Sequence, residues 1–306
     1  MLASSEAVGH WDGTADRTPQ MPDDTLGRFK TLPDHVRGPL LAADLSDLFA
    51  VGALDHGDVT VKMSGKDLAT ISAGQDIDDA QMDLMKEAAH LRAERLPEIV
   101  DQIGAVLPYM AQTLRLGGGH APMASLLLAT VQSAASKISY QVKFQFSAPR
   151  PVQFSTGLRP VIQTPGHSSY PSGHATESFA LATVLYGLMH KQTLDVGTLS
   201  TALPDTLAIA DRIARGREIA GVHFPQDSAA GMVLGIAIGN AVVAAGLGVD
   251  TPSYGFDACR LGTALADPRA VFDGKGGTVG RGSVTPQPTP LARLVIGEAM
   301  AELSGA

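Results

Sequence analysis

Apolar residues recur at helical spacing over most of the chain. Between residues 123 and 140, for example, Leu127, Val131, Ala134 and Ile138 repeat every three or four positions, as on the buried face of a helix. The segment 76–116 has the same pattern, and its prolines are expected to divide it into two or three helices. The pattern predicts helices within residues 40–54, 76–116, 123–140, 174–190, 199–217, 227–247 and 290–303.

Two other patterns interrupt the helices. Alternating apolar residues in the segment 57–71 predict a short extended or hairpin element. Residues 1–40 and 265–290 mix Gly, Pro, Asp and Thr without periodicity, and predict an irregular N-terminal arm and a long loop. No strong linker divides the remainder. We therefore expect an all-α protein in which an arm, residues 1–40, precedes a single helical catalytic domain, residues 41–306.

The stretch 227–247 is apolar on every side and approaches the length of a membrane span. One interpretation is a membrane enzyme, and the other is a central helix that is buried all round. The segment opens with Asp227, contains Asn240, and has no comparable apolar partner in the sequence. These features favour a core helix, so the sequence predicts no membrane span.

Charge, cysteine content and the N-terminal residues narrow the partners and the cellular compartment that the sequence predicts. The 306 residues carry a formal net charge of −8, which argues against a general binder of nucleic acid or anionic membranes. The single cysteine, Cys259, excludes an internal disulfide. The first twelve residues have neither a basic nor an apolar signal region. We expect a soluble protein, cytoplasmic or, if a signal was removed, secreted or periplasmic, and a homo-oligomer is compatible with the sequence.

Three spaced clusters carry the candidate chemistry. They are Lys143-x6-Arg150-Pro, the run Pro171 to His174 with Ser172 and Gly173 inside it, and Arg217-x5-His223-x3-Asp227. Arginine offers a planar fork to two oxygens and lysine a point charge. Ser172 and Gly173 precede a predicted helix, whose first N–H groups favour an anion. Together the clusters predict a pocket for a tetrahedral oxyanion.

The histidines would do the chemistry in such a pocket. His223 and Asp227 are four residues apart, so a helical turn brings them together and the carboxylate fixes the imidazole tautomer. His174, at the helix start, would face the same anion. Taken singly, each residue has an ordinary explanation: a surface charge, a helix cap or a loop imidazole. It is the spaced combination that favours function.

The three clusters resemble the signature of the type 2 phosphatidic acid phosphatase / vanadium-dependent haloperoxidase superfamily, whose members are all-helical bundles. The resemblance implies that Lys143, Arg150, Ser172, Gly173 and Arg217 bind the oxyanion and that His174 is the acid–base residue. It implies that His223 is the phosphatase nucleophile or the ligand of vanadium, oriented by Asp227. Gly216 departs from the pattern, since serine usually precedes the motif arginine.

The run from Tyr170 to Ala175 is most similar to the soluble vanadium haloperoxidases. His167, seven residues before His174, matches a second histidine of the bromide-oxidising members, although it could be an ordinary loop imidazole. The resemblance therefore implies a vanadate cofactor and the oxidation of halide, with bromide favoured, by hydrogen peroxide, with halogenation of an organic acceptor. The alternative is a soluble acid phosphatase that needs no cofactor and hydrolyses phosphate monoesters through a phosphohistidine. A non-catalytic oxyanion binder is the third possibility.

Overall fold

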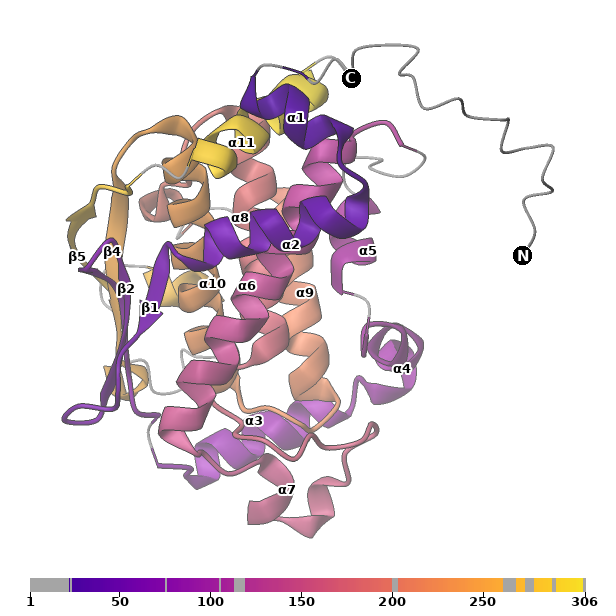
Figure 1. The fold of residues 1–306 in the computed structure, drawn as a ribbon. Coiled ribbons are helices and arrows are strands. Elements are labelled where there is room, and N and C mark those ends of the chain that lie inside the picture. The colour runs from indigo at the N-terminus through magenta and orange to yellow at the C-terminus, as the bar shows by residue number, and fades with distance from the viewer. Residues whose placement is uncertain are drawn as a thin grey trace, which may run out of the picture.

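The fold is a helical bundle with a five-stranded sheet along one side (Figure 1). The computed structural model describes residues 22, 24–74, 76–104, 106–112, 119–199, 203–260, 268–272, 278–287 and 290–304. The helices within these residues are α1 (Thr25–Thr31), α2 (Asp34–Ser46), α3 (Asp79–Ala89), α4 (Arg92–Asp101), α5 (Val106–Ala111), α6 (Pro122–Phe146), α7 (Pro151–Phe154), α8 (Gly173–His190), α9 (Asp205–Ile219), α10 (Pro225–Leu247) and α11 (Pro290–Ser304).

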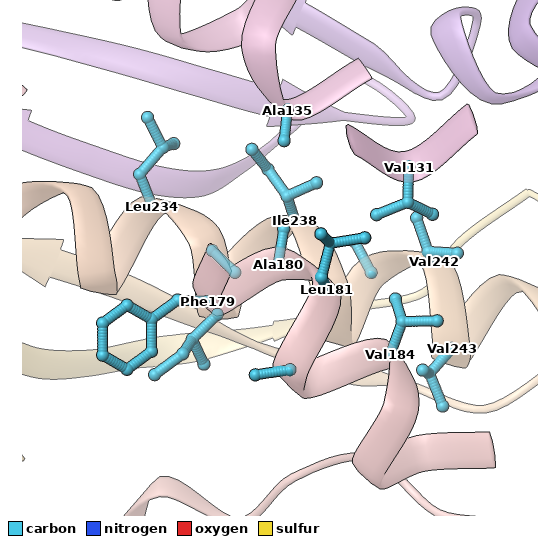
Figure 2. Packing of buried hydrophobic residues seen from close by; sticks show 14 of the residues in the cluster. Val131, Ala135, Phe179, Ala180, Leu181, Val184, Leu234, Ile238, Val242 and Val243 are labelled. Atoms are coloured by element: carbon cyan, nitrogen blue, oxygen red, sulfur yellow. The ribbon is translucent and has the colours of Figure 1, made fainter. Parts of the chain in front are cut away.

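Helix α10 is the centre of the molecule. Its residues from Pro225 to Ala245 are all buried, because it packs against α6, α8, α9 and α11 and against the sheet. Figure 2 shows α10 side chains such as Ile238 and Val242 meeting Ala180 and Val184 of α8 and Val131 of α6. A helix surrounded in this way must be apolar on every face, which explains the uniform composition of the segment.

The same helix corrects one expectation from the sequence. Among the residues that the structure describes, α10 is long and apolar enough to cross a membrane, with a mean hydropathy of 1.9. In the molecule, 89% of that window is buried. The prediction that the chain contains no membrane span was therefore wrong as stated, since α10 has the length and composition of one.

A stripe of three glycines lets α10 lie directly on α8. Gly231, Gly235 and Gly239 follow one another at a spacing of four, so they share one face of α10. A Cβ atom at Gly235 would lie 2.5 Å from the carbonyl oxygen of Thr176 in α8. The same atom at Gly231 would lie 2.6 Å from the carbonyl oxygen of Ser172. The two helix backbones therefore touch, and this contact fixes the start of α10 against the start of α8.

We expect Gly235→Ala to destabilise the protein by about 1–3 kcal/mol, the usual effect of overpacking, because a backbone carbonyl cannot move aside as a side chain can. Urea unfolding measures the change. Gly297→Ala is the matched control: Gly297 lies inside α11 with no atom within 4 Å of a built Cβ. Alanine there should be neutral or stabilise the fold by up to about 1 kcal/mol through helix propensity. Equal effects of the two changes would contradict close packing as the cause.

The prediction of an all-α fold was wrong. Five strands, β1 (Phe49–Val51), β2 (Asp58–Met63), β3 (Lys66–Ser72), β4 (Thr251–Phe256) and β5 (Thr278–Val284), form one sheet in sequence order. The pairing of β3 with β4 is parallel, and the other neighbours are antiparallel. The hairpin expected within 57–71 is confirmed as β2 and β3. The C-terminal strands were missed because Gly, Pro and Ser in TPSYGF and TVGRGSV suggest a loop.

Two further expectations from the sequence differ from the structure. Within the segment expected to be an irregular arm, residues 1–21 and 23 lie outside the described residues. They include the first twelve residues, in which the sequence predicts no signal region. The remainder is largely helical, since α1 starts after Asp24, whose carboxylate accepts a hydrogen bond from the Gly27 N–H, and α2 starts after Pro33. Within the expected loop 265–290, β5 is a strand, while residues 265–267, 273–277 and 288–289 lie outside the described residues.

Candidate active site

Ends of several helices meet around one cavity of about 290 Å³. Lys143 lies in the last turn of α6, Arg150 immediately precedes α7, and Arg217 lies in the last turn of α9. His174 lies in the first turn of α8, and His223 lies in the loop that leads into α10. All five side chains line the cavity, as do Gly173 and His167. The structure thus brings together seven of the nine residues that the sequence singled out.

His223, which lines the cavity, forms a buried pair with Asp227 behind it. The Nδ1 atom of His223 lies 3.0 Å from Oδ2 of Asp227. The same oxygen accepts hydrogen bonds from the Phe224 N–H, at 2.9 Å, and from the hydroxyl of Ser169. Burial raises the pKa of Asp227 to about 6. Because the carboxylate accepts a hydrogen bond from the Nδ1–H group, the lone pair of the imidazole is on Nε2.

Burial and the neighbouring cations Lys143 and Arg150 hold the pKa of His223 well below its usual value. The imidazole is therefore neutral at physiological pH, and Nε2 is available as a nucleophile or a ligand. In this structure Nε2 lies 3.1 Å from Nη1 of Arg150, which donates to it.

Backbone carbonyl groups hold Arg150 rigidly beside this nitrogen. The guanidinium donates to the carbonyl oxygen of Val222 at 2.8 Å, of His167 at 3.1 Å and of Ser168 at 3.2 Å. Three fixed acceptors leave the planar fork little freedom to rotate. The charge is thus placed in advance where a group bound to His223 would carry its oxygens.

The other two cations keep N–H groups in reserve. The ammonium of Lys143 donates to the carbonyl oxygens of Ser168 and Ser169, both at 2.9 Å, which uses two of its three protons. Arg217 donates through Nη2 to the carbonyl oxygen of Ile99 at 2.8 Å and to the side chain of Gln102 at 3.2 Å. Its Nε and Nη1 are buried and find no partner among the described residues.

Buried donors without a partner destabilise the folded protein unless a ligand accepts their hydrogen bonds. Burial also lowers the pKa of Lys143 to about 7 and of Arg217 to about 10. A bound anion would reverse both effects, because it favours the charged forms. The donor set therefore fits an oxyanion.

His174 has the position of an acid–base group. Its Nε2 lies 3.1 Å from the carbonyl oxygen of Gln102, which can only accept, so in the neutral ring Nε2 carries the proton and Nδ1 the lone pair. Burial, together with the charge of Arg217, lowers the pKa of His174 to about 4. The dianion of a phosphate ester would raise this pKa again, since it stabilises the imidazolium.

Three predicted residues differ in how they face the cavity. Ser172 is fully buried behind it, where its hydroxyl caps α8 by accepting from the Ala175 N–H and its own N–H donates to the carbonyl oxygen of Asp227. Asp227 likewise lies behind the lining and acts through His223. His167 lies at the rim, with Nδ1 3.2 Å from Nη2 of Arg150 and its ring edge-on to Tyr140.

Several polar residues of the site were missed from the sequence. Ser139 lines the cavity one helical turn before Lys143, and its buried hydroxyl finds no partner in the described part of the chain. Ser169 holds the carboxylate of Asp227. Glu177 lines the cavity from α8. The spacing of four residues between Ser139 and Lys143 was the available signal, because it places both on one face of the helix.

Among known proteins, the model of the PAP2 superfamily matches residues 122–247, which is less than half of the chain. Two decaprenylphosphoryl-5-phosphoribose phosphatases of Mycobacterium tuberculosis, from strains CDC 1551 / Oshkosh and ATCC 25618 / H37Rv, are each 34% identical over 87 residues. The match covers 28% of this chain and 42% of each relative, so it spans less than half of the relatives' length.

A solved structure, the first transmembrane PAP2-type phosphatidylglycerolphosphate phosphatase from Bacillus subtilis, is 21% identical. It has a TM-score of 0.28, over 53% of this chain and 75% of that one. The two mycobacterial relatives are named as phosphatases. The names support the phosphatase interpretation of the sequence and give no support to a haloperoxidase.

Proposed function

We propose that this protein is a phosphatase that hydrolyses phosphate monoesters through a covalent phosphohistidine on His223. The observation that carries the proposal is the buried imidazole whose Nδ1 is held by Asp227 and whose Nε2 faces a cavity lined by three cations. That arrangement supplies an oriented nucleophile and a site for an oxyanion at the same place. The phosphatase names of the relatives support the same class of reaction.

In the first step, Lys143, Arg150 and Arg217 neutralise the non-bridging oxygens of the ester. The Nε2 lone pair of His223 attacks phosphorus and forms the P–N bond, while the bond between phosphorus and the ester oxygen breaks. His174, in its protonated form, donates a proton to the departing oxygen, so that the leaving group is an alcohol. Asp227 stabilises the positive charge that the imidazole of His223 gains.

In the second step, water attacks the phosphohistidine. His174, now neutral, takes a proton from the water as its oxygen bonds to phosphorus, and the P–N bond breaks. The products are inorganic phosphate and His223 with its lone pair restored. His174 ends the cycle protonated and ready for the next ester. The cations hold the phosphoryl oxygens throughout, which lowers the energy of both transition states.

Vanadate has the same tetrahedral shape and charge as phosphate, and the donor set described above fits it: the three cations would hold its oxygens and His223 Nε2 its central atom. We propose that vanadate binds as an inhibitor in competition with the ester. A role as cofactor in halide oxidation, which the sequence resemblance implied, gains no support from the relatives. The third possibility, a non-catalytic binder, would hold phosphate without turnover.

The proposal is tested by adding p-nitrophenyl phosphate to the purified chain and following the release of p-nitrophenol. We expect hydrolysis that vanadate and inorganic phosphate both inhibit competitively, raising KM without changing kcat. A parallel assay with hydrogen peroxide, bromide and vanadate should show no halogenation. Tight binding of phosphate without hydrolysis would refute the proposal in favour of a binding protein, and vanadate-dependent bromination would favour a haloperoxidase.

A further inference from the structure

Part of the cavity wall takes no part in the mechanism above. It is formed by one face of α6 and the first turns of α8, and its side chains are neutral or acidic. They are Gln132, Ser136, Ser139, Tyr140 and Glu177. The cations that bind phosphate come instead from the helix ends, so the cavity is chemically divided.

This wall continues into an open groove of about 640 Å³ along α6. Gln132, Ser136, Tyr140 and Glu177 line both the cavity and the groove. The remaining residues of the groove are Ser133, Lys137 and Gln141. An ester whose phosphate lies among the cations therefore has space for its other half along a groove that reaches solvent.

Glu177 is the residue of this wall with the most specific chemistry. It lies three residues after His174 in α8, so the two side chains are neighbours on one face of the helix. Its Oε2 accepts a hydrogen bond from Nε2 of Gln132 at 3.0 Å, which fixes the carboxylate. Burial raises the pKa of Glu177, and the hydrogen bonds from Gln132 and Ser136 and the charge of Lys143 offset only part of this rise.

A carboxylate can only accept hydrogen bonds, and it has room for about four. Gln132 and Ser136 already donate to it, and Glu177 and His174 both line the cavity, so a remaining acceptor site would serve the part of the ester that receives the proton and leaves. An anionic leaving group would be repelled there, whereas a hydroxyl group would be held. The amide of Gln132 and the hydroxyl of Ser136 add both donors and acceptors, which suits several adjacent hydroxyl groups.

We propose that Glu177 and Gln132 form a leaving-group subsite that selects phosphate esters of polyhydroxylated, sugar-like alcohols. The inference rests on the proposed function, because it names the substrate class of that same site. The charge of Lys143 already offsets part of the charge of Glu177, so a neutral polyol fits the subsite better than a cationic amine does.

The test compares kcat/KM for ribose 5-phosphate with that for phenyl phosphate, which has the same phosphate and no hydroxyl groups. We expect the wild-type protein to prefer the sugar ester, and Glu177→Ala to lower this preference at least about tenfold, as the loss of hydrogen bonds to a charged group does. Glu177→Gln, which preserves shape, should have a smaller effect in the same direction. Glu94→Gln is the matched control, since Glu94 is exposed on α4 away from the cavity.

The possible outcomes separate the subsite from the reaction itself. If the wild-type protein hydrolyses neither ester, both the proposed function and the subsite are refuted. Hydrolysis of both without a preference for the sugar would overturn the subsite alone. An equal loss on both esters in Glu177→Ala would assign Glu177 a positioning role beside Lys143. Finally, a preference for O-phosphoethanolamine over ribose 5-phosphate would show that the carboxylate selects an ammonium group.

Discussion

His223→Ala is expected to abolish ester hydrolysis while the protein still binds inorganic phosphate weakly. The change removes the nitrogen that forms the covalent bond to phosphorus, so we expect turnover to fall by at least about 10⁴-fold, in the range seen when a catalytic nucleophile is removed. Asp227 then lacks its imidazole partner but still accepts hydrogen bonds from the Phe224 N–H and from Ser169. The floor of the cavity should therefore keep its shape.

Anion binding in the same variant separates the nucleophile from the cations. Lys143, Arg150 and Arg217 remain, so isothermal titration should detect phosphate at low salt and a marked loss of affinity when the salt concentration is raised. His35→Ala is a matched control, since His35 is an exposed histidine of α2. An active His223→Ala protein, or one in which vanadate and the ester bind independently, would show that the two anions do not share this pocket.

His174→Ala should lower kcat by about 10²–10⁴-fold, the usual contribution of a general acid, while the affinity for inorganic phosphate changes little. The loss should depend on the leaving group. p-Nitrophenolate leaves readily without a proton, whereas the alcohol of ribose 5-phosphate does not. We therefore expect the variant to lose far more activity on the sugar ester than on p-nitrophenyl phosphate. Equal losses of binding and turnover would identify His174 as a ligand of the anion instead.

The pH profile gives a second measure of the same residue. Burial and Arg217 lower the pKa of His174 to about 4, below its ordinary value of 6.5. The acid form that the first step needs thus becomes scarcer in the free protein as the pH rises from 4. We expect kcat/KM for the sugar ester to fall with increasing pH, and to fall less steeply in His174→Ala.

The lowered pKa of His174 also makes the stability of the folded protein depend on pH. Since the folded state disfavours the imidazolium, the stability that neutral His174 contributes is complete above pH 6.5. It is lost as the pH falls from there towards about 4. Phosphate should reduce this loss, because it stabilises the charged ring. Thermal unfolding at about pH 5, between the two pKa values, with and without phosphate, measures the difference.

The sequence was informative about the site because its charged residues are closely constrained. Lys143 and Arg217 are separated widely along the chain, yet each lies at the end of a helix whose apolar pattern was readable. The role of Ser172 could not be predicted in the same way. A serine before a helix is either a cap or a ligand, and only the structure shows its hydroxyl turned to the Ala175 N–H. Glu177 belongs to no motif, so its place in the cavity depends on packing.

The fold could be predicted where hydrophobic periodicity is strong. It could not be predicted where a segment becomes a strand only by pairing with its neighbours in the sheet. The burial of α6, α8 and α10 follows from their own residues. The sheet does not, because β4 and β5 are weak strand sequences that become strands through their neighbours. Likewise, the short α1 and α2 carry little pattern of their own and depend on tertiary contacts.

The parallel pairing of β3 with β4 has a consequence for synthesis of the chain. A ribosome completes β3 at Ser72 and reaches β4, which begins at Thr251, only after most of the molecule between them has been synthesised. At about 5–20 residues per second, the β2–β3 hairpin waits on the order of ten to forty seconds with one edge unpaired. Leu68 to Ile71, buried in the finished protein, are exposed to other nascent chains during that interval. The yield of folded protein should therefore depend on translation speed and on chaperones that cover this edge.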